Sequence, residues 1–92
     1  MEKEVKIGDI VLSKAGRDAG KYFVVVKAEG NFCYICNGKL RGCNKPKKKK
    51  LRHIERLGRV SDFAADKLCS GENLTDREFK AEIRSFEENI SN

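Results

Sequence analysis

The chain has 92 residues, 39% of them hydrophobic and 37% charged, with no tryptophan and a formal net charge of +6. A chain of this length buries only about 60–70% of its unfolded surface, which disfavours an enclosed active-site cavity and favours a binding surface. The sequence has neither an apolar run of signal-peptide length nor one of about 20 residues that would span a bilayer, so we expect a cytoplasmic protein that does not enter membranes. We also expect a monomer.

The first part of the chain has the pattern of short β-strands separated by turns. Residues 5–14 mix β-branched and polar side chains, as a strand does, and residues 15–20 form a turn that contains two glycines. Residues 21–27 have the strongest strand pattern in the sequence, and a turn at residues 29–31 joins them to a second strand at residues 32–36. These two strands are predicted to form a hairpin.

The middle of the chain combines a further turn with a dense run of charge. Asn37-Gly38 tolerates the positive φ of a two-residue hairpin turn and predicts a further strand through Leu40 and Arg41. Residues 42–50 contain four consecutive lysines and predict an exposed loop, because like charges resist packing. Residues 51–57 have apolar side chains at every third position, which fits either a short helical turn or a final strand. Short strands at this spacing predict a small β-barrel.

The last third of the chain has helical periodicity. Ser61 is suited to cap a helix over residues 62–69, which Gly71 can end. Thr75 and Glu78 form a capping box at the start of a second helix, whose apolar face we expect to cover the barrel. This face consists of Phe79, Ile83, Phe86 and Ile90, and Leu74 can staple onto Phe79. Phe63 and Leu68 of the first helix are also expected to pack against the barrel. The alternative is that the face docks in a groove of a protein partner.

The charge is divided unevenly along the chain. Residues 1–60 contain 16 Lys/Arg and 6 Asp/Glu, a net charge of +10, whereas residues 61–92 contain 4 and 8, a net charge of −4. A basic segment attracts polyanions and releases their condensed counterions, which points to nucleic acid or an anionic membrane surface. We therefore divide the chain into a basic β-domain over residues 1–60 and an acidic helical extension over residues 61–92, which is not expected to contact phosphates.

The cysteines permit a metal site but do not predict one. Cys33, Cys36 and Cys43, with His53 or Cys69 as a fourth ligand, have a spacing that zinc can use. However, residues three apart in a strand point to opposite faces, so Cys33 and Cys36 are not expected to hold one ion. We expect reduced thiols, no metal and no cofactor.

A glycine-containing segment, Gly-Arg-Asp-Ala-Gly-Lys at residues 16–21, lies between two apolar segments at residues 7–11 and 22–26. It closely resembles the KOW motif of ribosomal and transcription-elongation proteins. Over residues 5–57 the chain is most similar to the fourteen-e family of archaeal and eukaryotic large-subunit ribosomal proteins. The resemblance implies a five-stranded Src-homology-3-like barrel whose loops contact ribosomal RNA, with Gly20 as the defining glycine of the motif.

The same segment and the lysine run carry the predicted RNA contacts. Gly16 and Gly20 have no side chains, which lets backbone N–H groups approach a sugar-phosphate chain, although both glycines are equally well explained as turn residues. Lysines supply point charges for phosphates and no planar fork for bases, so binding should depend on shape and on salt. The predicted RNA-binding residues are Lys14, Gly16, Arg17, Gly20, Lys21, Lys39, Arg41, Lys45, Lys47, Lys48, Lys49, Lys50, Arg52 and His53.

The aromatic residues are few, and most of them are needed to fill a core. We assign Phe23 and Phe32 to the core and leave Tyr34 open as a stacking surface for bases. No nucleophile with a base, no pair of carboxylates and no phosphate-binding loop can be assembled, so we do not expect an enzyme. The sequence predicts a protein that binds ribosomal RNA and associates with the ribosome. The alternatives are a transcription-associated KOW module and a protein-interaction module that uses the terminal helix.

Overall fold

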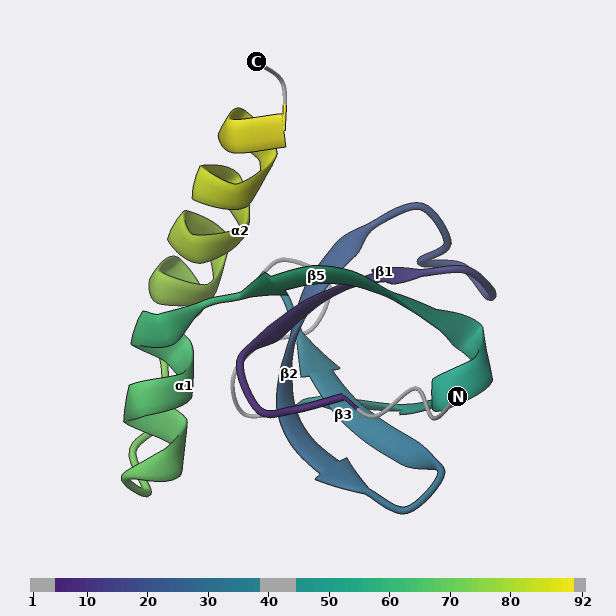
Figure 1. Ribbon diagram of the computed structural model, residues 1–92, viewed down its shortest axis with the longest axis horizontal. Helices are drawn as coiled ribbons and strands as arrows, with labels where there is room; N and C mark the ends of the chain where they lie inside the picture. The colour runs from purple at the N-terminus through teal and green to yellow at the C-terminus, as the bar shows by residue number, and fades with distance from the viewer. Residues whose placement is uncertain (1–4, 39–44, 91–92) are drawn as a thin grey trace.

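The computed structural model describes residues 5–38 and 45–90, which form one antiparallel sheet and two helices. The strands are β1 (Asp9–Ser13), β2 (Tyr22–Glu29), β3 (Phe32–Cys36), β4 (Lys47–Lys50) and β5 (Ile54–Val60), and a 3₁₀ turn, η1 (Leu51–His53), joins β4 to β5. The helices are α1 (Asp62–Cys69) and α2 (Asp76–Ile90). The strand order is β4-β3-β2-β1-β5, and Figure 1 shows a curved sheet with both helices on one side of it. The predicted class, mainly β with C-terminal helices, is confirmed.

Strand β1 is shorter than the strand predicted over residues 5–14, because a turn precedes it. The Asp9 N–H donates to the Lys6 carbonyl at 3.0 Å, and the Asp9 carboxylate accepts from the Lys6 N–H at 2.8 Å. Gly8 has a φ of +94°, and a Cβ at this position would lie 2.7 Å from the Cβ of Ala65 in α1. The glycine therefore permits both the turn and the close approach of α1, and the predicted strand is wrong before Asp9.

The exposed loop predicted over residues 42–50 is wrong for the four lysines of β4. They pair with β3 in a register that places Lys49 opposite Cys33 and Lys48 opposite Tyr34. Successive side chains of a strand point to opposite faces, so neighbouring lysines in β4 are directed away from one another. This separation relieves the repulsion on which the loop prediction was based.

The sequence predicts a strand before β4, and either a helical turn or a strand after it. The strand predicted through Leu40 and Arg41 lies outside the described residues. Residues 51–57 contain both of the elements that their pattern allowed, because η1 leads directly into β5. The Leu51 N–H donates to the Asn31 carbonyl at 2.9 Å, which fixes the end of β4 beside the β2–β3 turn.

The sheet separates two hydrophobic clusters. The cluster on the helical side consists of Ile10, Val24, Cys36, Ala64, Leu74, Phe79, Ile83 and Phe86. The cluster on the other side consists of Val5, Val11, Phe23, Val25, Cys33, Ile35 and Ile54. Phe23 and Val25 belong to the second cluster and the intervening Val24 to the first, as strand alternation requires. The core assignment of Phe23 is therefore confirmed.

The core assignment of Phe32 is wrong. Its side chain is only half-buried, and among the described residues it belongs to neither cluster. Alternation along β3 places Phe32 and Tyr34 on the same face as Cys36, which is the helical side of the sheet. The helices cover this face around Cys36 and leave the other end of β3 partly open.

Both helices begin with the caps that the sequence predicts. The Ser61 hydroxyl accepts the Ala64 N–H at 3.1 Å at the start of α1. At the start of α2, the Thr75 N–H donates to the Glu78 carboxylate at 2.8 Å, and the Glu78 N–H donates to the Thr75 hydroxyl at 3.1 Å. The hydrogen bond from the Thr75 backbone and the pairing with Lys67 lower the pKa of the Glu78 carboxyl. The capping residues were therefore sufficient to predict where both helices begin.

The apolar face of α2 packs against the sheet, as predicted. Phe79, Ile83 and Phe86 are buried in the cluster that contains Ile10 and Val24, and the rings of Tyr22 and Phe86 meet edge to face with centroids 5.2 Å apart. These three side chains of the predicted face therefore belong to the core, and the side chain of Ile90 lies outside the described residues.

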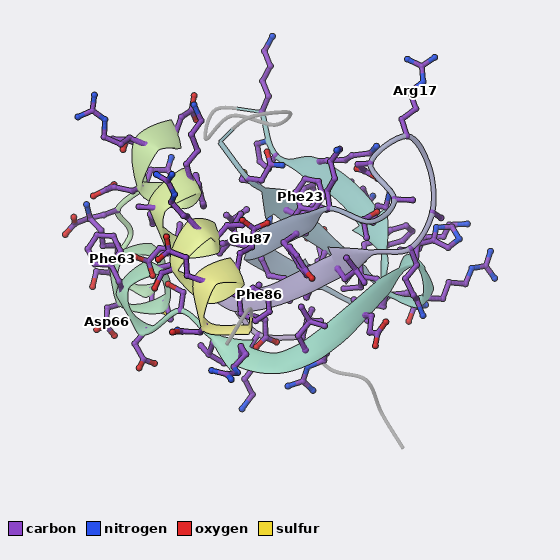
Figure 2. The ribbon with its side chains drawn as sticks, turned by 90° about the horizontal axis from the view of Figure 1, so that it is seen from above. Arg17, Phe23, Phe63, Asp66, Phe86 and Glu87 are labelled. Carbon is purple, nitrogen blue, oxygen red and sulfur yellow. The ribbon has the colours of Figure 1, made fainter. Side chains whose placement is uncertain are left out.

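The prediction that Phe63 of α1 also packs on the barrel is wrong. Its side chain is 44% exposed, and Figure 2 shows it on the outer side of α1. Neither helix within the described ranges is long and apolar enough to cross a bilayer.

Replacing Phe79 with alanine should lower the free energy of unfolding by about 3–5 kcal/mol, because the substitution leaves a cavity between α2 and the sheet. The matched control is Phe63→Ala, which changes the same residue type at an exposed position and should cost less than about 1 kcal/mol. Urea unfolding of both variants measures the difference. Equal losses would contradict a core shared by the helix and the sheet.

Candidate nucleic-acid interface

The loop between β1 and β2, residues 14–21, is held by the buried carboxylate of Asp18. This carboxylate accepts from the Ser13 hydroxyl at 2.8 Å and from the Lys49 ammonium at 2.9 Å. The Lys47 ammonium lies 3.2 Å from its other oxygen. The Lys49 ammonium also donates to the Ala15 carbonyl at 2.8 Å, so one lysine of β4 bonds twice to this loop. These contacts join segments that are 31 residues apart in the chain.

The environment of Asp18 favours the charged carboxylate. Burial alone would raise the pKa of Asp18, but the hydrogen bonds from Lys49, Ser13 and Lys47 outweigh it and lower the pKa from 3.8 to about 2. A carboxyl group with a lowered pKa in the folded state stabilises the fold at neutral pH. The ion pair therefore contributes most of its stability above pH 4 and loses it as the pH falls towards 2.

Two of the predicted RNA-binding residues, Lys47 and Lys49, form ion pairs within the protein, so their charges are already paired. The Lys49 side chain is only 7% exposed and that of Lys47 is 28% exposed, and both ammonium groups pair with Asp18. Burial of charged groups is tolerated when they are paired and hydrogen-bonded, as they are here. Neither lysine can neutralise a phosphate without breaking this pair.

The glycines of the KOW-like segment are turn residues in this fold. Gly16 has a φ of +85° and Gly20 a φ of +87°, which only glycine adopts readily. A Cβ on Gly16 would lie 3.3 Å from the Lys49 ammonium, whereas a Cβ on Gly20 would have open space around it. The turn explanation is therefore sufficient for both glycines.

Exposed cations lie on the β1–β2 loop and on η1, and we call Lys14, Arg17 and Arg52 the basic end. The Lys14 N–H donates to the His53 carbonyl at 2.8 Å, which brings the loop beside η1. All three side chains are exposed, and none has an ion-pair partner among the residues that the structure describes. Figure 2 shows Arg17 pointing away from the loop on the side opposite the helices.

The remaining predicted contacts are distributed over other positions. Lys45, Lys48 and Lys50 are exposed, and His53 is half-buried. Lys39 and Arg41 lie outside the described residues. The predicted set is therefore divided between elements: Lys14, Arg17 and Arg52 lie on the β1–β2 loop and η1, whereas Lys48 and Lys50 lie on β4.

Two cations of the acidic extension, Lys80 and Arg84, were not predicted to face the β-domain. Together with Gly20 and Lys21 they line a hollow of about 580 Å³ between α2 and the sheet. Its full lining is Gly20, Lys21, Tyr22, Asn37, Lys80, Ile83, Arg84 and Glu87. The sequence contains the signal, because Lys80 and Arg84 are four apart and flank the apolar face of α2.

The chain matches no family model, and no curated protein matches it.

The described cysteines are free thiols in separate surroundings. Cys33 and Cys36 are buried in different hydrophobic clusters, so the prediction that they face opposite sides of the sheet is confirmed. Burial raises the pKa of the Cys33 thiol to about 11, although nearby Lys49 opposes the rise. Cys69 is exposed at the end of α1, and Cys43 lies outside the described residues. No three His, Cys, Asp or Glu side chains converge as a metal site within residues 5–38 and 45–90.

Replacing Asp18 with asparagine should remove part of the acid sensitivity of the fold. Because the pKa of Asp18 lies at about 2 in the folded protein, the wild type should lose about 2 kcal/mol of stability through this group between pH 5 and pH 2. The variant should be less stable at pH 7 and should show a flatter decline on acidification. Urea unfolding at several pH values tests this, with the exposed Asp66→Asn as control. An unchanged pH profile in Asp18→Asn would contradict the assignment.

Neighbouring lysines of β4 should differ sharply in their effect on stability. Lys49→Gln removes the buried partner of Asp18 and should cost about 3 kcal/mol, because it leaves a buried charge incompletely paired. Lys50→Gln changes an exposed side chain and should alter the free energy of unfolding by about 0.5 kcal/mol or less. Thermal or urea unfolding compares the two. Similar costs would show that β4 does not depend on the ion pair.

Proposed function

We propose that the chain is a KOW-type barrel of the Src-homology-3-like class that binds structured RNA, ribosomal RNA in particular, without catalysing a reaction. The five antiparallel strands and their curvature support the barrel. The KOW-like segment, residues 16–21, forms the connection between β1 and β2, so its resemblance falls on a loop beside the basic end. Association with the ribosome in the cytoplasm rests on the same resemblance.

The observation that carries the proposal is the basic end itself. Asp18 pairs with Lys49 and Lys47 and so holds the loop against β4. Lys14 and Arg17 on this loop and Arg52 on the adjoining η1 remain exposed. Phosphates of a nucleic acid are the natural counter-charges for such a group, because their neutralisation releases condensed counterions. The basic end is therefore the surface that we assign to RNA.

The chemistry of this surface favours recognition of the backbone over recognition of sequence. Lys14 supplies a point charge, while Arg17 and Arg52 supply planar forks that match phosphate oxygens. Contacts of this kind position a protein on a nucleic acid but carry little sequence information. Double-helical RNA is recognised mainly through its shape and its phosphates, which agrees with a structured target.

The basic end should determine how steeply RNA affinity depends on salt. The variant Lys14→Gln/Arg17→Gln/Arg52→Gln removes three exposed charges and should reduce the slope of log affinity against log salt by about 2–3, since each phosphate contact contributes about 0.9. Fluorescence anisotropy with a hairpin from a helical region of ribosomal RNA, measured between low and moderate salt, gives the slope.

The control removes the same net charge elsewhere. Lys6→Gln/Arg59→Gln/Arg77→Gln changes three exposed cations that lie outside the basic end, and it should leave the slope within about one unit of the wild type. If both variants lose affinity equally, RNA binding depends on overall charge and not on the basic end. If neither variant changes the slope, the proposed site is wrong.

A further inference from the structure

The helical side of the sheet has an open region that combines aromatic rings with lysines. Strand pairing places Phe32 opposite Lys50 and Tyr34 opposite Lys48. Both aromatic side chains are half-buried and both lysines are exposed. A register irregularity in β2 brings Lys27 opposite Tyr34 on the neighbouring strand. We call these five residues the aromatic–lysine face.

Helix α2 covers one end of this side of the sheet and leaves the aromatic–lysine face open. Cys36, two residues beyond Tyr34, is buried in the same cluster as Phe79 and Phe86 of α2. Phe32 and Tyr34 belong to neither hydrophobic cluster of the described residues. The fold thus holds two rings on a rigid strand at positions where they contribute little to the core.

Both rings of this face make cation–π contacts with lysines of the protein itself. The Lys48 ammonium lies 4.3 Å from the centroid of the Phe32 ring, and the Lys27 ammonium lies 5.6 Å from the centroid of the Tyr34 ring. At exposed sites such contacts are weak and lysine side chains are mobile, so a flat ligand can replace the ammonium over the ring. The displaced ammonium then remains close enough to pair with an anionic group of that ligand.

A ligand that is both flat and anionic, with repeating units, is a single strand of nucleic acid. Base stacking on aromatic side chains combined with basic contacts to the backbone is the general mode of single-strand binding. Phe32 and Tyr34 are two residues apart on β3, or roughly 6–7 Å. Bases stacked in a helix are only about 3.4 Å apart along one strand, so the two rings suit nucleotides that are unstacked from each other.

The charges on the face indicate on which side of the rings the phosphates of the bound nucleic acid lie. Glu29 lies opposite Phe32 in β2, and its carboxylate is 3.8 Å from the Lys27 ammonium. This carboxylate repels phosphates at the β2 side of the rings. Lys48 and Lys50 have no carboxylate partner among the described residues, so the phosphates are expected to follow β4.

We propose that the aromatic–lysine face binds unpaired nucleotides, with two bases stacked on Phe32 and Tyr34 and their phosphates neutralised by Lys48 and Lys50. This inference rests on the RNA binding proposed above and adds a second contact of different chemistry. The basic end holds the helical part of an RNA, and the face holds a single-stranded segment that leaves the helix.

The test compares an RNA hairpin with the same hairpin carrying a single-stranded extension of six nucleotides. The full-length wild type should bind the extended hairpin roughly tenfold more tightly, in line with stacking of one or two bases. An extension with abasic sugars keeps the phosphates and removes the bases, and it should give only a small part of this gain. Because this comparison uses the unaltered protein, it does not depend on the folding of a variant.

Variants then test whether the tighter binding of the extended hairpin depends on the aromatic–lysine face. Phe32→Leu/Tyr34→Leu keeps apolar bulk but removes the flat rings, and it should reduce the gain to the small part seen with the abasic extension while retaining the wild-type melting temperature within a few degrees. The matched control is Phe63→Leu, since Phe63 is an exposed ring that also has a lysine ammonium, that of Lys67, 5.4 Å from its centroid. This control should preserve the full gain.

The outcomes separate this inference from the proposed function. If the wild type binds neither hairpin, the proposed RNA binding fails and this inference fails with it. If it binds the hairpin but the extension adds nothing, or adds as much when abasic, only the aromatic–lysine face is refuted. Binding of an acidic peptide that requires Phe32 and Tyr34, without any gain from the extension, would assign the face to a protein partner and overturn the proposal.

Discussion

The ion pair between Asp18 and Lys49 is the interaction on which the packing of β4 against the β1–β2 loop depends. Its two charges are almost fully buried, and such burial is tolerated only because Ser13, Lys47 and the Ala15 carbonyl complete the hydrogen bonding. Four lysines in a row have little tendency to form a strand. The carboxylate supplied by the β1–β2 loop lets β4 form, and β4 in turn holds that loop in place.

One consequence is that residues of the same type in one tract have different roles. Lys47 and Lys49 point towards Asp18, whereas Lys48 and Lys50 remain exposed beside the rings of β3. The division follows from the alternation of side chains along a strand and not from composition. The positive charge that is free to attract a ligand is therefore smaller than the formal charge of the tract, and it has a defined direction.

The sequence was informative where the controlling interaction is local, and it failed where the partner is distant. Ser61, Thr75 and Glu78 cap helices through contacts three residues away, so their pattern was sufficient. β4 was predicted as a loop from its run of like charges, and the carboxylate that stabilises it as a strand is 31 residues from Lys49. The expectation that the acidic extension avoids phosphates rested on a summed charge, which conceals that Lys80 and Arg84 line a hollow beside Lys21.

The position of β4 in the strand order affects more than the proposed RNA surface. β4 stands at one end of the order β4-β3-β2-β1-β5, so one side of its backbone has no neighbour among the described strands. Unpaired strand edges invite further strands to add, which leads to aggregation, and lysines at an edge oppose this because two such edges repel each other. Lys48 and Lys50, the exposed lysines of β4, therefore oppose edge-to-edge joining of two copies of the protein, although two half-buried aromatic rings lie on the adjacent strand.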